Sequence, residues 1–179
     1  MPIRKAILLT ILFVCGASAQ VVDLSSLDKL TNRAKETNTI SLDGDNLRTA
    51  SRFLSGDDPD MKDVKTIIEG IKGIWVRNFT FKGKEEYGKN DLAPIRKQLQ
   101  GGGWSKVLES KSESDHEFTE VYLRTDNQKT AGLAVICEEP KELTVAVITG
   151  SIDLERLGKL SGNLGIPNIE LKHKKKDEE

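Results

Sequence analysis

The sequence is poor in the two residue types that most often form catalytic and metal sites, with two histidines and two cysteines among 179 residues. His173 lies among lysines near the end of the chain, and His116 lies between Asp115 and Glu117 in a predicted turn. Catalytic and metal-binding histidines normally have partners at a set spacing, and neither histidine has one nearby in the sequence. We therefore expect no catalytic residue, no metal site and no cofactor.

An excess of basic residues is also missing. Lysine and arginine total 27 against 28 aspartates and glutamates, for a formal net charge of −1. Proteins that bind nucleic acid usually concentrate positive charge on one face. We expect no nucleic acid partner.

The one glycine triplet of the chain does not stand where a phosphate-binding loop would. The triplet at residues 101–103 follows a predicted helix and precedes a predicted strand. A phosphate cradle needs the reverse order, because the free N–H groups of a helix N-terminus bind the anion. We interpret the triplet as a helix stop and turn.

Long apolar runs are missing except at residues 6–16. Arg4 and Lys5 precede this run, and Ala17, Ser18 and Ala19 follow it. A basic start, a short apolar stretch and a small-x-small site are typical of a secretory signal peptide, and the run is too short to remain as a membrane span. We predict cleavage after Ala19 and no transmembrane segment in the exported chain, which would be periplasmic or secreted.

Cys15 offers a different outcome, a lipid anchor. Lipoprotein signals place small residues directly before the modified cysteine, and here Phe13 and Val14 are bulky. We favour a cleaved, soluble protein and keep the anchor at Cys15 as the alternative. Cleavage would leave Cys137 without a disulfide partner in the same chain, as a small buried hydrophobe.

Alternating and β-branched residues predict five strands after a helical beginning. Leu24, Leu27, Leu30 and Ala34 recur on one helical face, residues 47–54 predict a second helix, and residues 58–71 a third, with a short strand as an option at residues 39–42. A helix from Asp91 to residue 100 interrupts the strand series, and another follows Ser151. The predicted strands are residues 73–81, 104–112, 117–125, 130–137 and 143–149.

Short connections require the last four strands to be antiparallel neighbours. The last two are apolar on both faces, which predicts that they are central or covered. The crossover through the Asp91 helix predicts that strands 73–81 and 104–112 run parallel. We expect an α+β fold with a mainly antiparallel five-stranded sheet, helices chiefly on one face and a helix-rich N-terminal part. The domain would span residues 20–168, between a signal peptide (1–19) and a charged, disordered tail (169–179).

The alternation of side chains along two predicted strands suggests an interaction face. Trp75, Arg77, Phe79 and Phe81 share one parity, and Tyr122 and Arg124 point away from the core side of their own strand. If helices cover only one face, these aromatic and arginine side chains would line the other, a composition enriched in binding surfaces. The alternative is that the aromatic residues are core and the parity assignment is shifted by one.

One resemblance is carried by residues 70–79, 91–99, 103–107, 121–124, 139–145 and 150–157. Together these segments resemble one family of exported bacterial proteins, domain of unknown function 4252, over most of the chain from Leu24 to Pro167. The resemblance implies a signal peptide and an envelope location, and it carries no catalytic residue. Many relatives resemble lipoproteins, from which the Cys15 context departs, and some lie near genes for extracytoplasmic sigma factors.

These observations predict a non-enzymatic domain that binds a protein or ligand at the cell envelope. A hydrolase built on dispersed carboxylates with His116 is one alternative. A partner of an extracytoplasmic sigma and anti-sigma system, suggested by the resemblance, is another. The sequence does not identify the ligand, the oligomeric state or the pathway.

Overall fold

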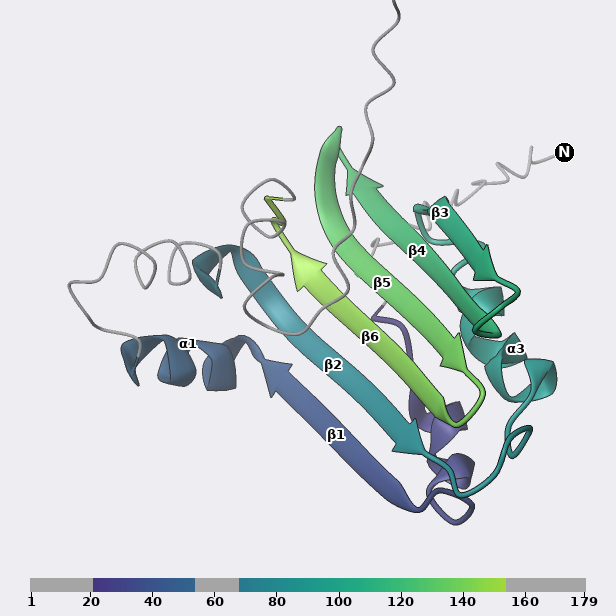
Figure 1. Cartoon of the computed structure of the whole chain (residues 1–179). Coiled ribbons are helices and arrows are strands. Elements are labelled where there is room, and N and C mark those ends of the chain that lie inside the picture. The colour runs from purple at the N-terminus through teal and green to yellow at the C-terminus, as the bar shows by residue number, and fades with distance from the viewer. Residues whose placement is uncertain (1–20, 54–67, 154–179) are drawn as a thin grey trace, which may run out of the picture.

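In the part of the chain that the structure describes, one six-stranded antiparallel sheet forms the frame of the protein (Figure 1). The computed structural model describes residues 21–53 and 68–153. In the sheet the strands are ordered β1-β2-β6-β5-β4-β3. The described elements are the 3₁₀ helix η1 (Ser25–Leu30), β1 (Glu36–Asp43), α1 (Gly44–Phe53), β2 (Ile71–Thr80), α3 (Lys89–Gln98), β3 (Trp104–Ser112), β4 (Glu117–Asp126), β5 (Lys129–Glu139) and β6 (Glu142–Gly150).

The two most apolar strands are central, as the sequence predicted. β5 and β6 occupy the middle of the sheet, and their register places Ala134 opposite Val147 and Ile136 opposite Val145. All four of these side chains are fully buried. The sheet therefore has its strongest hydrophobic support at its centre.

One face of the sheet carries the main core. We call it the helix face, because η1 and α3 both pack against it; it includes Phe79, Val145, Ile136 and Tyr122. In Figure 1 these two helices lie behind the lower half of the sheet. Leucines and isoleucines of the helices join strand residues in one buried cluster, which also contains Leu27, Leu30, Leu92, Ile95, Leu99, Phe81 and Leu143.

The opposite face carries a smaller apolar cluster. Val121, Leu133 and Ile152 are its buried members. The partly buried side chains of Leu108, Leu123, Val135 and Ile148 pack against them. Ile152 also donates its backbone N–H to Thr130 O at 3.1 Å, so the chain stays hydrogen-bonded to β5 just beyond the end of β6.

The prediction of five strands and a helix-rich N-terminal part was wrong. The sixth strand is β1, which contains the optional strand at residues 39–42 and extends it at both ends. β1 is an edge strand held by backbone pairing to β2, so it does not need the apolar alternation that identifies buried strands. Residues 21–53 form one 3₁₀ helix, one strand and one α-helix.

The remaining fold predictions have mixed outcomes. Strands β2 and β3 do run in the same direction, but three strands separate them, so they are not neighbours. The helix starting near Asp91 is confirmed as α3, and the helix at residues 47–54 as α1. Most of the predicted helix at 58–71, the helix after Ser151 and the tail lie outside the described residues. Within 21–53 and 68–153, no helix is long and apolar enough to cross a membrane.

Candidate functional site

The predicted interaction residues share one face of the sheet, and it is the helix face. Register aligns Trp75 on β2 with Val147, Ala134 and Tyr122 on the following strands. Phe79 and Tyr122 are 0% and 3% exposed, because the main core includes both. Their burial matches the alternative interpretation of the aromatic residues as core. Of the five predicted residues, Trp75, Arg77 and Arg124 are half-buried and retain exposed surface.

The indoles of Trp75 and of a second tryptophan, Trp104, lie against glycines of this face. The indole of Trp75 fills the space where a Cβ of Gly73 would be. A Cβ at Gly132 would lie 2.8 Å from Cη2 of Trp104. Glycine permits this close approach because it has no side chain. Each indole therefore packs directly against the backbone of a strand.

These two pairs belong to one row across the end of the sheet. Gly73, Thr149 and Gly132 are aligned on β2, β6 and β5, and Arg124 and Trp104 continue the row on β4 and β3. The described helices η1 and α3 pack on the other half of this face. We call Trp75, Thr149, Arg124 and Trp104 the tryptophan row. Trp75 and Arg124 are its half-exposed members, whereas Thr149 and Trp104 are buried.

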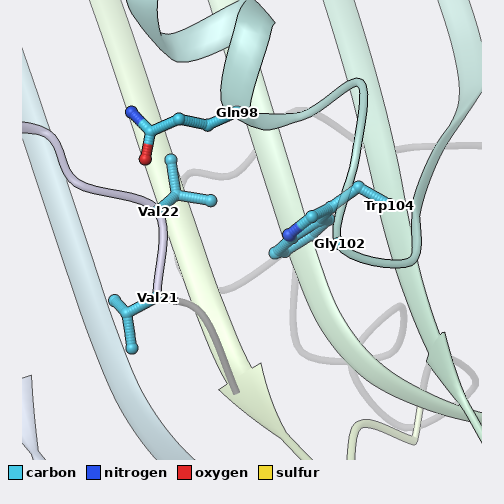
Figure 2. Close-up of a pocket in the computed structure, with 5 residues that line it drawn as sticks. All are labelled: Val21, Val22, Gln98, Gly102 and Trp104. Carbon is cyan, nitrogen blue, oxygen red and sulfur yellow. The ribbon is translucent and has the colours of Figure 1, made fainter. Parts of the chain in front are cut away.

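A small cavity adjoins Trp104 where the N-terminal segment meets α3 (Figure 2). Val21, Val22, Gln98, Gly102 and Trp104 line it, and its volume of about 10 Å³ holds about one water molecule. It is too small for a cofactor or substrate.

The cavity lies beside a two-way link between the N-terminal segment and α3. The amide of Gln98 accepts a hydrogen bond from the backbone N–H of Asp23 at 2.8 Å and donates one to Asp23 O at 2.9 Å. These two bonds fix the N-terminal segment against the end of α3. The cavity is therefore a packing gap beside that link.

A buried ion cluster fastens α3 to the sheet. Glu120 on β4 has 3% of its side chain exposed and accepts hydrogen bonds from three donors. These are Arg96 Nε at 2.6 Å, Lys106 Nζ at 2.6 Å and the Tyr122 hydroxyl at 3.0 Å. Arg96 also pairs with Glu138 on β5. We call these five residues the Glu120 cluster.

The electrostatics of the Glu120 cluster favour stability over catalysis. Burial acts to raise the pKa of Glu120, but hydrogen bonds from Lys106 and Arg96 outweigh it, so the pKa lies below its ordinary value. The pKa of Arg96 is raised, because pairing with Glu120 and Glu138 exceeds the opposing effect of burial. A general acid or base works best with a pKa near the working pH. Both groups are instead held in their charged forms.

Other ion pairs connect η1 to α3 and to β2. Asp91 in the first turn of α3 accepts from Lys29 at 3.0 Å and Arg33 at 2.9 Å. Arg77 Nε lies 3.5 Å from Asp28 Oδ1. Arg77 is therefore partly engaged in holding η1, which distinguishes it from Trp75 in the predicted interaction face.

His116 lies apart from these groups. It occupies the turn between β3 and β4, is exposed and has a φ of 57°. The pKa of neighbouring Asp115 is lowered by hydrogen bonds from Ser112 and Ser114. His116 does not line the cavity beside Trp104. Across the described ranges, no group of three or more His, Cys, Asp or Glu residues is placed to hold a metal ion.

A larger hollow lies beside α1. Its volume is about 310 Å³, and Leu47, Ile68 and Ile71 supply its apolar lining, with Arg48, Glu69 and Lys72 as charged members. Neither His116 nor Glu120 lines it. The hollow is formed by α1 and by residues 68–72. Both parts adjoin residues 54–67, which lie outside the described residues, so the hollow is not a candidate site.

Sequence reasoning missed the tryptophan–glycine pairs and the Glu120 cluster. One signal was present for the cluster: Glu120 has the same parity as Tyr122, which places an acid among residues facing the helices. Gly73 and Trp75 also share one parity on β2, whereas the Gly132–Trp104 pair had no local signal, because Gly132 contacts Trp104 across two strand boundaries.

Comparison with protein-family models gives a match over most of the chain. Residues 31–160 match the model described as domain of unknown function, DUF4252. No curated protein matches the chain.

Proposed function

The chain belongs to the DUF4252 family, and from that premise we propose that it is an exported, non-enzymatic cell-envelope domain that binds a protein through the exposed part of the tryptophan row. The observation that carries the proposal is that a half-exposed indole, Trp75 on β2, and a half-exposed guanidinium, Arg124 on β4, lie on the same face of one sheet, with β6 and β5 between their strands. Tryptophan and arginine are enriched among residues that dominate binding energy. The rigid strands lower the entropy lost on binding.

The non-enzymatic part of the proposal is supported by the chemistry of the titratable groups. Glu120 and Glu138 both lie against Arg96 and are not gathered with His116. Export is supported by the sequence pattern at residues 1–19.

Binding can be tested by capture from an envelope extract. We expect the tagged protein to retain a specific partner, and Trp75→Ala and Arg124→Ala each to reduce its recovery at least tenfold, because each removes an anchor from the row. Ser105→Ala changes an exposed β3 residue on the opposite face and should leave recovery unchanged. Full retention of every captured protein by both row variants would refute the proposal.

Export can be tested by mass spectrometry of the protein expressed from its full sequence. We expect a mature chain that begins at Gln20, with no lipid attached. Cys15→Ser should give the same mature mass, because Cys15 would lie in the removed segment. A diacylglyceryl group on Cys15 would overturn the soluble form, and an intact Met1 terminus would overturn export.

A further inference from the structure

The two edges of the sheet differ in how they are protected against further pairing. β3, at one edge, has a register shift between Lys106 and Leu108 and carries Lys106, Glu109 and Lys111. Bulges and charged side chains are the usual means by which an edge strand resists pairing with another chain. β3 is therefore a protected edge.

β1, at the other edge, has none of these features within its length. It pairs with β2 over eight consecutive residues without a register shift, and it has no proline. Its two charged residues, Glu36 and Asp43, are its ends. Among the described residues, no strand pairs with its outer side (Figure 1). Alternate residues of β1 thus present N–H and C=O groups outward.

An exposed apolar side chain lies in the middle of this edge. Ile40 is 46% exposed, and it lies on the same face as Asn38 and Leu42. Thr37, Thr39 and Ser41 point to the helix face. Threonine and isoleucine are strong strand formers, so this edge favours pairing and leaves Ile40 to be covered by a partner.

We propose that β1 is a dimer interface at which a second copy of this chain adds its own β1, antiparallel, about a two-fold axis at Thr39. This pairing joins the two sheets into one of twelve strands. A second copy is favoured over an unrelated strand because it satisfies two unprotected edges at once. A two-fold axis perpendicular to the sheet also generates an isologous contact that closes at the dimer.

Charge complementarity and side-chain pairing favour Thr39 as the residue on the two-fold axis. In this register Lys35 of each copy lies opposite Asp43 of the other, which gives two complementary charge pairs and no like-charge pair. Thr37 lies opposite Ser41 on the helix face, and these side chains form hydroxyl pairs. The two Ile40 side chains become diagonal neighbours on the opposite face, within reach of each other. Each apolar side chain then covers the other.

The dimer can be tested by sedimentation equilibrium of the processed protein expressed from its full sequence. We expect twice the monomer mass. Ile40→Lys should weaken self-association at least tenfold, because it removes the apolar contact and places two like charges beside the axis. Val107→Lys is the matched control, since Val107 is a 49% exposed hydrophobic residue on the protected edge. A monomer at all concentrations, or equal loss with both variants, would overturn the proposal.

The register can be tested by disulfide trapping in a Cys137→Ser background. Opposed residues have Cα atoms about 4.5–5.5 Å apart, which suits a disulfide. Thr39→Cys should therefore form a covalent dimer on mild oxidation. Ser41→Cys should not, because its two copies would lie about 13 Å apart along the strands. Equal trapping at both positions, or trapping at Ser41 alone, would overturn this register.

This interface stands apart from the proposed binding function. Trp75→Ala changes the helix face and leaves the β1 edge intact, so it should not alter the dimer mass. A failed capture experiment with an intact dimer, or the reverse, therefore identifies which proposal is wrong.

Discussion

Replacing Gly150 by alanine is expected to lower the free energy of unfolding by about 2–6 kcal/mol, because backbone strain of about 1–3 kcal/mol and overpacking of about 1–3 kcal/mol add together. Gly150 ends β6 with a φ of 127°, a conformation open to glycine and strained for other residues. A Cβ there would also meet Gly70 O, with Lys72 N at 2.6 Å and Ile71 Cα at 2.8 Å. These are backbone atoms, so no side-chain rotation relieves the contact.

Urea denaturation at neutral pH measures this effect, and Gly101→Ala is its control. Gly101 has no heavy atom within 4 Å of an added Cβ and is not among the glycines with a positive φ. Its substitution should change stability by less than about 0.5 kcal/mol. Equal stability of the two variants would mean that the backbone around Gly150 relaxes freely.

A second large effect is expected from Arg96→Met, which should cost about 2–4 kcal/mol. The substitution keeps much of the side-chain volume but removes the guanidinium from Glu120 and Glu138. Removing one partner of a buried ion pair costs about 3–5 kcal/mol, because the remaining charge stays buried. The expected cost is lower for Arg96, since Glu120 keeps Lys106 and Tyr122 as donors. Lys106→Met removes a more exposed partner and should cost less.

The pH dependence of the Arg96→Met effect provides an independent check. The pKa of Glu120 is lowered in the folded protein, because the hydrogen bonds from Lys106 and Arg96 outweigh the opposing effect of burial. Its contribution to stability is therefore present above the unfolded pKa and lost as pH falls through the folded pKa. Arg96→Met raises the folded pKa, so the stability gap between wild type and variant should shrink as the pH falls from neutral through that range. Asp91, whose pKa is also lowered, is unchanged in both proteins and cancels in the difference. A gap that stays constant would contradict the ion-pair account.

The sequence predicted β2 to β6 well, because their signals are local. The predicted bounds of β3 match the structure, and those of β2, β4, β5 and β6 differ by at most two residues at either end. Alternating apolar residues and short turns define these strands without reference to the rest of the chain. β1 was underestimated, because an edge strand depends on its neighbour for support. The adjacency of β2 and β6 has no local signal, since it joins distant parts of the chain.

The sequence predicted which side chains of the candidate site share a face of the sheet, but not which of them are buried. Parity correctly placed Trp75, Arg77, Phe79, Tyr122 and Arg124 on one face. Which face the helices would cover depends on the packing of η1 and α3, and parity does not contain that information. The buried set therefore includes Phe79 and Tyr122. The binding role of the three half-buried members, Trp75, Arg77 and Arg124, stays a prediction.

The position of β6 has a consequence for the order of folding. β6 is the last strand of the sheet to be synthesised, yet it lies between β2 and β5 and joins two otherwise separate pieces of sheet. Contacts such as that between Asn78 and Glu142 span 64 positions, and long loop closures of this kind slow folding. The main core closes only when residue 150 is available. If the chain is exported unfolded, as we propose, this late closure leaves the main core open, and the chain competent for translocation, until β6 has been made.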